Sequence, residues 1–207
     1  MKVNSFSVQL NEGLYDPGIF KAFFLAGGPG SGKSFVTSSA FAGTGLKLVN
    51  SDVKFERDLK KAGLSMKMPD EEEYFRNIIR KSAKKFAITT LDKYIEGRLG
   101  LVIDSTGRDY DMIARQHNQL KQIGYDTYMI FVNTSLDVAL ARNARRERTI
   151  PEYITTASWN GVQSNIGKFQ RLFGMSNFLV VDNNKSDLEL TTLTMNRVSK
   201  VVRKLIS

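Results

Sequence analysis

The sequence predicts an α/β fold in which helices cover both faces of a parallel sheet. Short apolar runs alternate along the chain with longer segments of helical periodicity, which is the pattern of strand–helix–strand units. The first apolar run leads directly into a glycine-rich turn, as where a strand passes into a helix. With 207 residues the chain has the length of one such domain, and we predict a single domain over residues 1–207.

Five of the apolar runs are short enough to be strands, and glycine or proline punctuates the helical patterns between them. Expected strands cover residues 22–26, 46–50, 101–104, 127–132 and 178–181. Expected helices cover residues 33–41, 53–62, 69–96, 109–123, 135–147, 151–173 and 187–205. Residues 1–19 show no clear period and are predicted to form an edge strand or an arm.

The longest helical pattern spans residues 69–96, with Asp70 and Glu73 at the spacing of a capping box near its start. Apolar side chains recur within it at three- and four-residue intervals. Together with the short helix before it, this pattern predicts a helical insert over residues 53–98, between the second and third strands.

The glycine-rich turn, residues 27–34, reads Gly-Gly-Pro-Gly-Ser-Gly-Lys-Ser and matches G-x-x-x-x-G-K-[ST]. In such a loop the backbone N–H groups and the helix N-terminus surround phosphate oxygens. Lys33 reaches the β- and γ-phosphates, and the hydroxyl of Ser34 binds Mg²⁺. A flexible linker would not have a strand before it and a helix after it. The loop residues expected to bind a nucleoside triphosphate are Gly28, Pro29, Gly30, Ser31, Gly32, Lys33 and Ser34.

Composition sets further limits on the kind of protein. The absence of cysteine excludes disulfides and thiolate metal sites. A formal net charge of +9 favours a polyanionic partner, either nucleic acid or phosphorylated small molecules. We expect no signal peptide, no membrane-spanning segment and a cytoplasmic location.

Two acidic residues follow predicted strands, at the edge of a parallel sheet where ligands bind. Asp52 comes after the second strand, where a carboxylate can accept the proton of an acceptor hydroxyl. Asp104 ends the third strand, where a carboxylate can hold the Mg²⁺ of a bound triphosphate. Each of the two could instead be a helix N-cap.

An arginine-rich run follows the fourth strand, within residues 139–148. Arg142 and Arg146 lie four residues apart, hence on one helix face. Positioned arginines stabilise the charge that spreads over a transferring phosphoryl group. The run therefore predicts a lid over about residues 142–152, although a solvated basic face is the alternative.

The sequence also supports an expectation for one further arginine, for the sole histidine and for the sole tryptophan. Arg57 lies roughly one helical turn beyond Asp52 and is predicted to contact the substrate. His117, the sole histidine, stands among polar residues and is expected to be exposed to solvent. Trp159 is expected to pack rather than to stack on a base.

A GTP-binding protein is a competing interpretation. Residues 104–107 fit D-x-x-G and residues 184–187 fit N-K-x-D. The long insert before Asp104 and the lack of a strand after Asp187 count against it. Ser186 and Glu189 also have the spacing of a capping box, which explains the second match as a helix start.

Most of the chain, from about Phe20 to Asn184, resembles P-loop kinases of the zeta-toxin and polynucleotide-kinase group, and also small kinases of large bacteriophages. The resemblance rests on residues 27–34, on Asn50-Ser51-Asp52, on Val102 to Arg108, on Arg142 to Pro151 and on Val180 to Asn183. The third strand ends in Asp-Ser-Thr, where zeta toxins have an acidic residue followed by Gly-Thr.

The resemblance implies a P-loop NTPase fold with strand order 2-3-1-4-5. It implies Asp52 as the base, Lys33 on the phosphates, and Arg142 and Arg146 as lid arginines. It also implies that the loop containing Asn183 lies near the adenine. Arg108, in the matched strand-end motif, is expected to contact the acceptor.

The predicted activity is transfer of the ATP γ-phosphoryl group, with Mg²⁺, to an acceptor hydroxyl. The charge favours a nucleic-acid acceptor, such as a polynucleotide 5′-hydroxyl or a hydroxymethylated base in phage DNA, which would place the protein in the host cytoplasm. A small nucleotide or nucleotide-sugar is the alternative acceptor. A GTPase or an ATP-hydrolysing module is the alternative activity, and the oligomeric state is left open.

Overall fold

The computed structural model describes residues 18–184 and 188–206. Five parallel strands form one sheet in the order β2-β3-β1-β4-β5, which confirms the predicted fold class and strand order. The strands are β1 (Lys21–Ala26), β2 (Lys47–Val49), β3 (Leu101–Asp104), β4 (Asp126–Asn133) and β5 (Phe178–Asp182). Of the predicted N-terminal arm, residues 1–17 lie outside the described part of the chain.

Helices connect successive strands, as parallel pairing requires. The α-helices are α2 (Lys33–Ala40), α3 (Ser51–Lys61), α4 (Glu73–Glu96), α5 (Tyr110–Gln122), α6 (Leu136–Ala144), α7 (Glu152–Ser164), α8 (Ile166–Phe173) and α9 (Leu188–Ile206), and the 3₁₀ turns are η1 (Asp70–Glu72) and η2 (Met175–Asn177). Across the described ranges, no helix is both long enough and apolar enough to cross a membrane.

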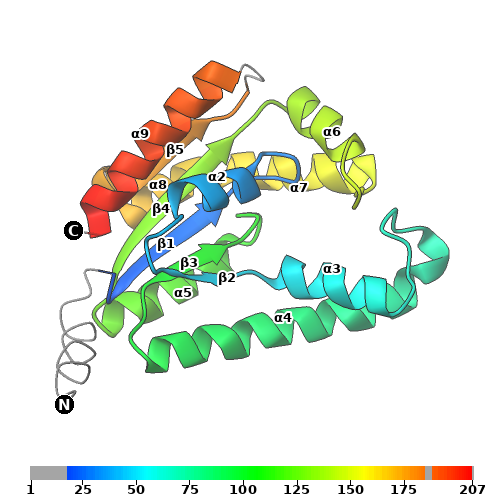
Figure 1. The fold of residues 1–207 in the computed structure, drawn as a ribbon, viewed down its shortest axis with the longest axis horizontal. Coiled ribbons are helices and arrows are strands. Elements are labelled where there is room, and N and C mark those ends of the chain that lie inside the picture. The colour runs from blue at the N-terminus through cyan, green and yellow to red at the C-terminus, as the bar shows by residue number, and fades with distance from the viewer. Residues whose placement is uncertain (1–17, 185–187, 207) are drawn as a thin grey trace, which may run out of the picture.

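The sheet lies between two helical layers (Figure 1). Successive residues of β1, the central strand, point to opposite faces because a strand has a two-residue period. Phe24 packs in the core formed with α5 and α8, whereas Phe23 packs in the core formed with α2 and α9. Both phenylalanines are fully buried. The result is a three-layer sandwich whose central strand leads straight into the phosphate loop.

The insert between β2 and β3 is a helical hairpin made of α3 and the much longer α4, which extend side by side past the edge of the sheet (Figure 1). A small apolar core of its own joins the two helices, built from Phe55 and Leu59 of α3, Ala83 of α4, and Met68 of the connection. This hairpin brings α4 side chains above the carboxyl ends of β2 and β3.

Most helices begin and end within three residues of their predicted bounds, but two predictions differ in kind. The pattern at 151–173 is two helices, because the chain turns tightly at Asn165, whose side-chain amide donates to the carbonyls of Gly107 and Arg108 at 3.1 and 2.9 Å. The predicted capping box of Asp70 and Glu73 is wrong: α4 begins after η1 and has no side-chain cap.

The expectation that His117 is exposed is also wrong. The residue is 7% exposed, and its ring packs against Phe173 with ring centroids 4.5 Å apart. Its Nδ1 atom lies 3.0 Å from the hydroxyl of Thr127 on β4. His117 shares the buried face of α5 with Ile113 and Leu120, at helical spacings of four and three residues. Burial lowers the pKa of this histidine.

Candidate active site

The phosphate loop, residues 27–34, connects β1 to α2 and contains glycines where a side chain would be strained and would clash. Gly30 has φ 78°, and a Cβ atom there would stand 2.2 Å from the carbonyl oxygen of Ala139. Gly32 has φ 92° and occupies the N-cap of α2 in a left-handed conformation. The loop therefore passes close against α6 before α2 begins.

Lys33, the first residue of α2, folds back over this loop. Its Nζ donates to the carbonyl oxygen of Gly27 at 2.7 Å. Burial lowers the pKa of Lys33, while the charges of Asp104 and Asp52 act in the opposite direction. The lysine and both predicted carboxylates thus share one electrostatic environment, as a triphosphate site with a divalent cation requires.

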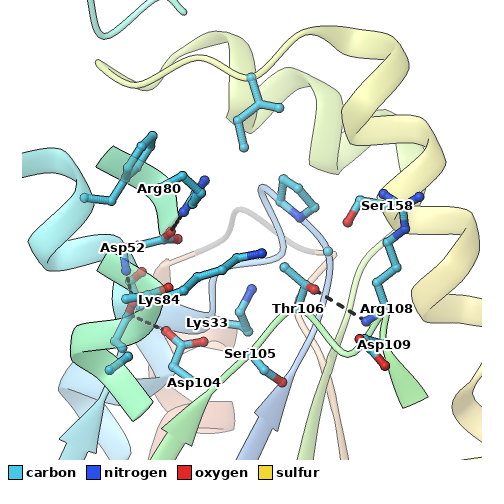
Figure 2. A pocket seen from close by; sticks show the side chains of 18 of the residues that line it. Lys33, Asp52, Arg80, Lys84, Asp104, Ser105, Thr106, Arg108, Asp109 and Ser158 are labelled. Carbon is cyan, nitrogen blue, oxygen red and sulfur yellow. Dashed lines mark hydrogen bonds and ion pairs between the residues drawn. The ribbon is translucent and has the colours of Figure 1, made fainter. Parts of the chain in front are cut away.

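Asp104 ends β3 and faces this site (Figure 2). Its Oδ2 atom accepts a hydrogen bond from the side-chain amide of Asn50 at 2.8 Å. Its Oδ1 atom is buried and has no hydrogen-bond partner among the residues that the structure describes. Burial raises the pKa of Asp104, against the effect of Lys33. Asp104 is not a helix cap, because Asp109 caps α5.

The unpartnered Oδ1 atom fits a place in a magnesium shell. Ser34 lies exposed in the first turn of α2, so these two residues would hold Mg²⁺, which supplies positive charge against the phosphates. Within the described ranges, no group of three or more acidic or histidine side chains could hold a metal by itself. Such a sparse protein shell suits Mg²⁺, because this ion usually keeps waters and binds substrate phosphates.

Asp52 lies in the first turn of α3, where Asn50 is the N-cap and accepts from the Asp52 amide at 2.6 Å. Its carboxylate is held from two sides. Oδ1 accepts from Arg80 at 2.6 Å, and Oδ2 accepts from Arg148 at 2.9 Å. Burial alone would raise the pKa of Asp52, but the two arginines prevail and lower it.

Arg80 comes from α4 and Arg148 from the connection between α6 and α7, so three separate segments meet at Asp52. The Arg80 guanidinium stacks over the ring of Phe55, 3.8 Å from its centroid, which fixes the plane of the group. The predicted base is therefore a carboxylate whose two oxygens have defined hydrogen-bond directions. Neither arginine was assigned to the site from the sequence.

The two predicted lid arginines, Arg142 and Arg146, both line the cavity but make different contacts. Arg142 Nη1 donates to the carbonyl oxygen of Asn183 at 2.8 Å, and the side-chain amide of Asn183 donates to the carbonyl oxygen of Ser31 at 2.7 Å. These residues tie the end of β5 to the phosphate loop. The charge of Arg146 acts on Lys33 across the cavity.

Arg57 lies away from the cavity, so the structure does not place this predicted substrate contact in the site. Its side chain is 58% exposed and pairs with Asp58 at 3.4 Å. Five residues along a helix correspond to about 140° of rotation from Asp52, which turns Arg57 to another face. Trp159 packs as expected, with its indole N–H donating to the carbonyl oxygen of Thr134 at 2.8 Å.

A single cavity of about 1530 Å³ joins the phosphate loop to Asp52 and continues between α4, α5 and α7. This volume exceeds the roughly 300–1,000 Å³ of a typical ligand pocket, so donor and acceptor fit together. In Figure 2, Lys33, Arg80 and Lys84 point into the cavity, and Arg108 borders it beside Ser158. The cations that line the cavity are Lys33, Arg76, Arg80, Lys84, Arg108, Arg142, Arg146, Arg148 and Lys168.

Sequence reasoning missed Arg80, Arg148 and the bridging role of Asn50. Arg148 belongs to the same arginine-rich run as Arg142 and Arg146, but no periodicity singles it out. Arg80 belongs to the cations of the insert, which have the pattern of a solvated helix face. Only Asn50 had a local signal, because Asn directly before a helix is a favoured N-cap.

The sequence profile of the zeta-toxin family matches residues 18–191, which include the whole of this site. The chain belongs to the zeta-toxin family. With the phosphate loop, the parallel sheet and the strand-end carboxylates described above, it is a P-loop kinase. No curated protein sequence matches the chain significantly.

Solved structures share the fold of this zeta-toxin family member at low sequence identity. A chain of the PezAT chromosomal toxin-antitoxin system of Streptococcus pneumoniae is 15% identical, with a TM-score of 0.57 over 98% of this chain and 92% of that chain. Shikimate kinase from Acinetobacter baumannii, in complex with shikimate, is 15% identical, with a TM-score of 0.56 over 90% and 93%. Deoxyadenosine kinase from M. mycoides, with bound dATP, is 16% identical, with a TM-score of 0.51 over 86% and 98%.

Proposed function

We propose that the protein transfers the γ-phosphoryl group of ATP to a hydroxyl of a small, phosphate-bearing acceptor of the nucleotide or nucleotide-sugar class. The observation that carries this proposal is the continuous cavity between the phosphate loop and Asp52. One end suits a triphosphate with Mg²⁺. The other end contains a carboxylate, within a wall of arginine and lysine side chains.

The chemistry follows from these positions. The acceptor oxygen attacks the γ-phosphorus, a new P–O bond forms, the bond from the γ-phosphorus to the β,γ-bridging oxygen breaks, and ADP leaves. Asp52 takes the proton of the acceptor hydroxyl. Lys33 and the loop amides bind the triphosphate, and Arg146 faces the charge that develops on the transferred group. Ser34 and Asp104 would hold Mg²⁺, which would supply positive charge against the phosphates.

A small acceptor is favoured over nucleic acid by the position of the base. Asp52 is paired with Arg148 of the connection between α6 and α7; Arg148 is only 5% exposed, while the Asp52 side chain is 44% exposed and borders the cavity. The cations of the acceptor end come from several elements that surround a cavity, so they suit a compact anion. A protein of similar fold also binds a small molecule: the shikimate kinase structure is a complex with shikimate.

The net charge of +9 still favours a polyanion, so nucleic acid is the second candidate acceptor. Incubation with γ-labelled ATP and a panel of nucleotides, nucleotide-sugars, oligonucleotides with 5′-hydroxyls and hydroxymethylated DNA distinguishes the two. We expect label on a nucleotide or nucleotide-sugar. Label on DNA would replace the small acceptor, and label found only as free phosphate would indicate a hydrolase.

A further inference from the structure

The connection between α6 and α7, residues 145–151, is docked on the tip of the α3–α4 hairpin. The backbone N–H of Thr149 donates to the carbonyl oxygen of Met66 at 3.1 Å. Lys67 Nζ donates to the Thr149 hydroxyl at 3.0 Å and to the carbonyl oxygen of Arg146 at 3.4 Å. We call residues 145–151 the docked loop.

The root of the docked loop is closed independently of its tip. The side-chain amide of Asn143 donates to the carbonyl oxygen of Ile150 at 2.6 Å, and its Oδ1 accepts from the N–H of Ile150 at 3.2 Å. Asn143 is buried, so this pairing has little competition from water. At the surface, Glu147 also pairs with Lys60 of α3 at 2.9 Å.

Arg148 is the most deeply buried residue of this loop. It is 5% exposed and lies between two carboxylates of α3, Asp52 and Glu56, which are one helical turn apart. Nη2 donates to Asp52 at 2.9 Å, while Nε lies 2.6 Å from Glu56 as an ion pair without hydrogen-bond geometry. Nη1 is buried and has no partner among the described residues. The loop thus inserts one charge beside the predicted base.

We propose that Arg148 is a positioning residue: by docking with its loop, it sets the direction of the Asp52 carboxylate and so makes phosphoryl transfer depend on the docked loop. The inference rests on the proposed function, because it needs Asp52 to be the base. Arg80 alone would leave one carboxylate oxygen without a partner. Misplacing a reacting group by about 1 Å can cost on the order of 10²-fold in rate.

Arg148 could affect turnover by orienting the Asp52 carboxylate or through its charge alone. Removing Arg148 has opposite expected effects on turnover in the two cases. The charged groups around Asp52 include Arg148 of the docked loop and its second partner Glu56, Arg80 of α4, Lys33 beside the phosphate loop and Asp104 of β3. Loss of Arg148 removes a charge that lowers the pKa of Asp52, which makes the carboxylate a stronger base. If charge alone mattered, turnover would rise or stay unchanged. If position matters, turnover falls although the base is stronger.

The test compares Arg148→Met and Arg148→Lys with Arg145→Ala, which removes the same charge from an exposed position of the docked loop outside the cavity. We expect kcat to fall on the order of 10²-fold in Arg148→Met, with KM for ATP nearly unchanged. Arg148→Lys should recover part of this loss, and Arg145→Ala should match the parent protein. Thermal unfolding of each variant checks that it is folded.

The deciding measurement is a double-mutant cycle with Asp52→Asn, assayed with the acceptor found in the labelling panel. If Arg148 acts through Asp52, Arg148→Met lowers kcat in the parent protein but adds little in the Asp52→Asn background. An equal factor in both backgrounds, or a parent-like kcat in Arg148→Met, overturns the inference and leaves the kinase proposal standing. Full turnover in Asp52→Asn itself overturns the proposed base, and the inference with it.

Discussion

Asn50 and Asp104, which are 54 residues apart in the chain, are joined by a 2.8 Å hydrogen bond from the Asn50 amide to Asp104 Oδ2. The carbonyl oxygen of the same side chain caps α3 at Asp52. One asparagine therefore links the carboxylate of Asp104 to the backbone of Asp52. This matters for a kinase, because the base and the metal carboxylate act on opposite ends of the same transfer.

Two substitutions of Asn50 should distinguish its contact with Asp104 from its capping of α3. Asn50→Ser keeps an N-cap oxygen but loses the amide that reaches Asp104, whereas Asn50→Ala loses both. We expect Asn50→Ala to cost about 1 kcal/mol more in unfolding free energy than Asn50→Ser. Both should lower kcat, because Asp104 is released in each. Chemical denaturation and steady-state kinetics measure the two effects. Equal stability of the variants would contradict the capping role.

Lys33→Ala should abolish phosphoryl transfer. The Lys33 side chain folds over the phosphate loop, with Nζ at 2.7 Å from the carbonyl oxygen of Gly27. Its loss removes charge from the triphosphate without disturbing a core contact. Lys61→Ala, at an exposed position at the end of α3, is the matched control. The labelled-phosphate assay reports the result, and parent-like turnover in Lys33→Ala would reject the assigned site.

Asp52→Asn should lower kcat by about 10²- to 10⁴-fold, the usual contribution of a general base. ATP affinity, measured by calorimetry, should stay close to that of the parent because the phosphate loop is untouched. Asp58→Asn provides a control on the same helix, since Asp58 pairs with Lys54 and Arg57 rather than with the cavity. A parent-like kcat would mean that Asp52 only orders the two arginines.

Asp52→Asn should also change how the free energy of unfolding depends on pH. The pKa of Asp52 is lowered below its ordinary value of 3.8, so the folded state favours its ionised form. This stabilisation is fully present above the unfolded-state pKa and is lost as the pH falls through the folded-state pKa. The difference in unfolding free energy between the parent and Asp52→Asn should therefore be constant near neutrality and shrink in acid below about pH 4. A difference independent of pH would contradict the ion pairs.

The buried His117 should make the stability of the protein depend on pH at milder acidity as well. Burial lowers its pKa below the ordinary 6.5, so the folded protein favours the neutral ring. Stability from this source is present above pH 6.5 and declines as the pH falls towards the folded-state pKa. His117→Gln should remove that decline from thermal unfolding curves between about pH 7.5 and 5. Because His117 is the sole histidine, one imidazole NMR signal reports its pKa directly.

The sheet and the donor end of the site could be predicted because their signals are local. Apolar runs mark strands by composition, and residues 27–34 encode a loop through glycines whose conformations other residues rarely adopt. Asp52 and Asp104 were found because parallel strands end at one edge, so position along the chain implied proximity. These inferences need no knowledge of how the helices pack.

Tertiary structure alone decided which cations meet the base. Arg80 and Arg148 reach Asp52 from 28 and 96 residues away along the chain. No periodic pattern in the sequence indicates contacts between residues so far apart. Arg57, close in sequence, turns to another face of α3, and His117 is buried because β4 and Phe173 cover its face of α5. The sequence by itself determined the fold and where phosphate binds. The docking of the 145–151 loop on the α3–α4 hairpin decided what surrounds the carboxylate, because that contact exists only when distant segments pack together.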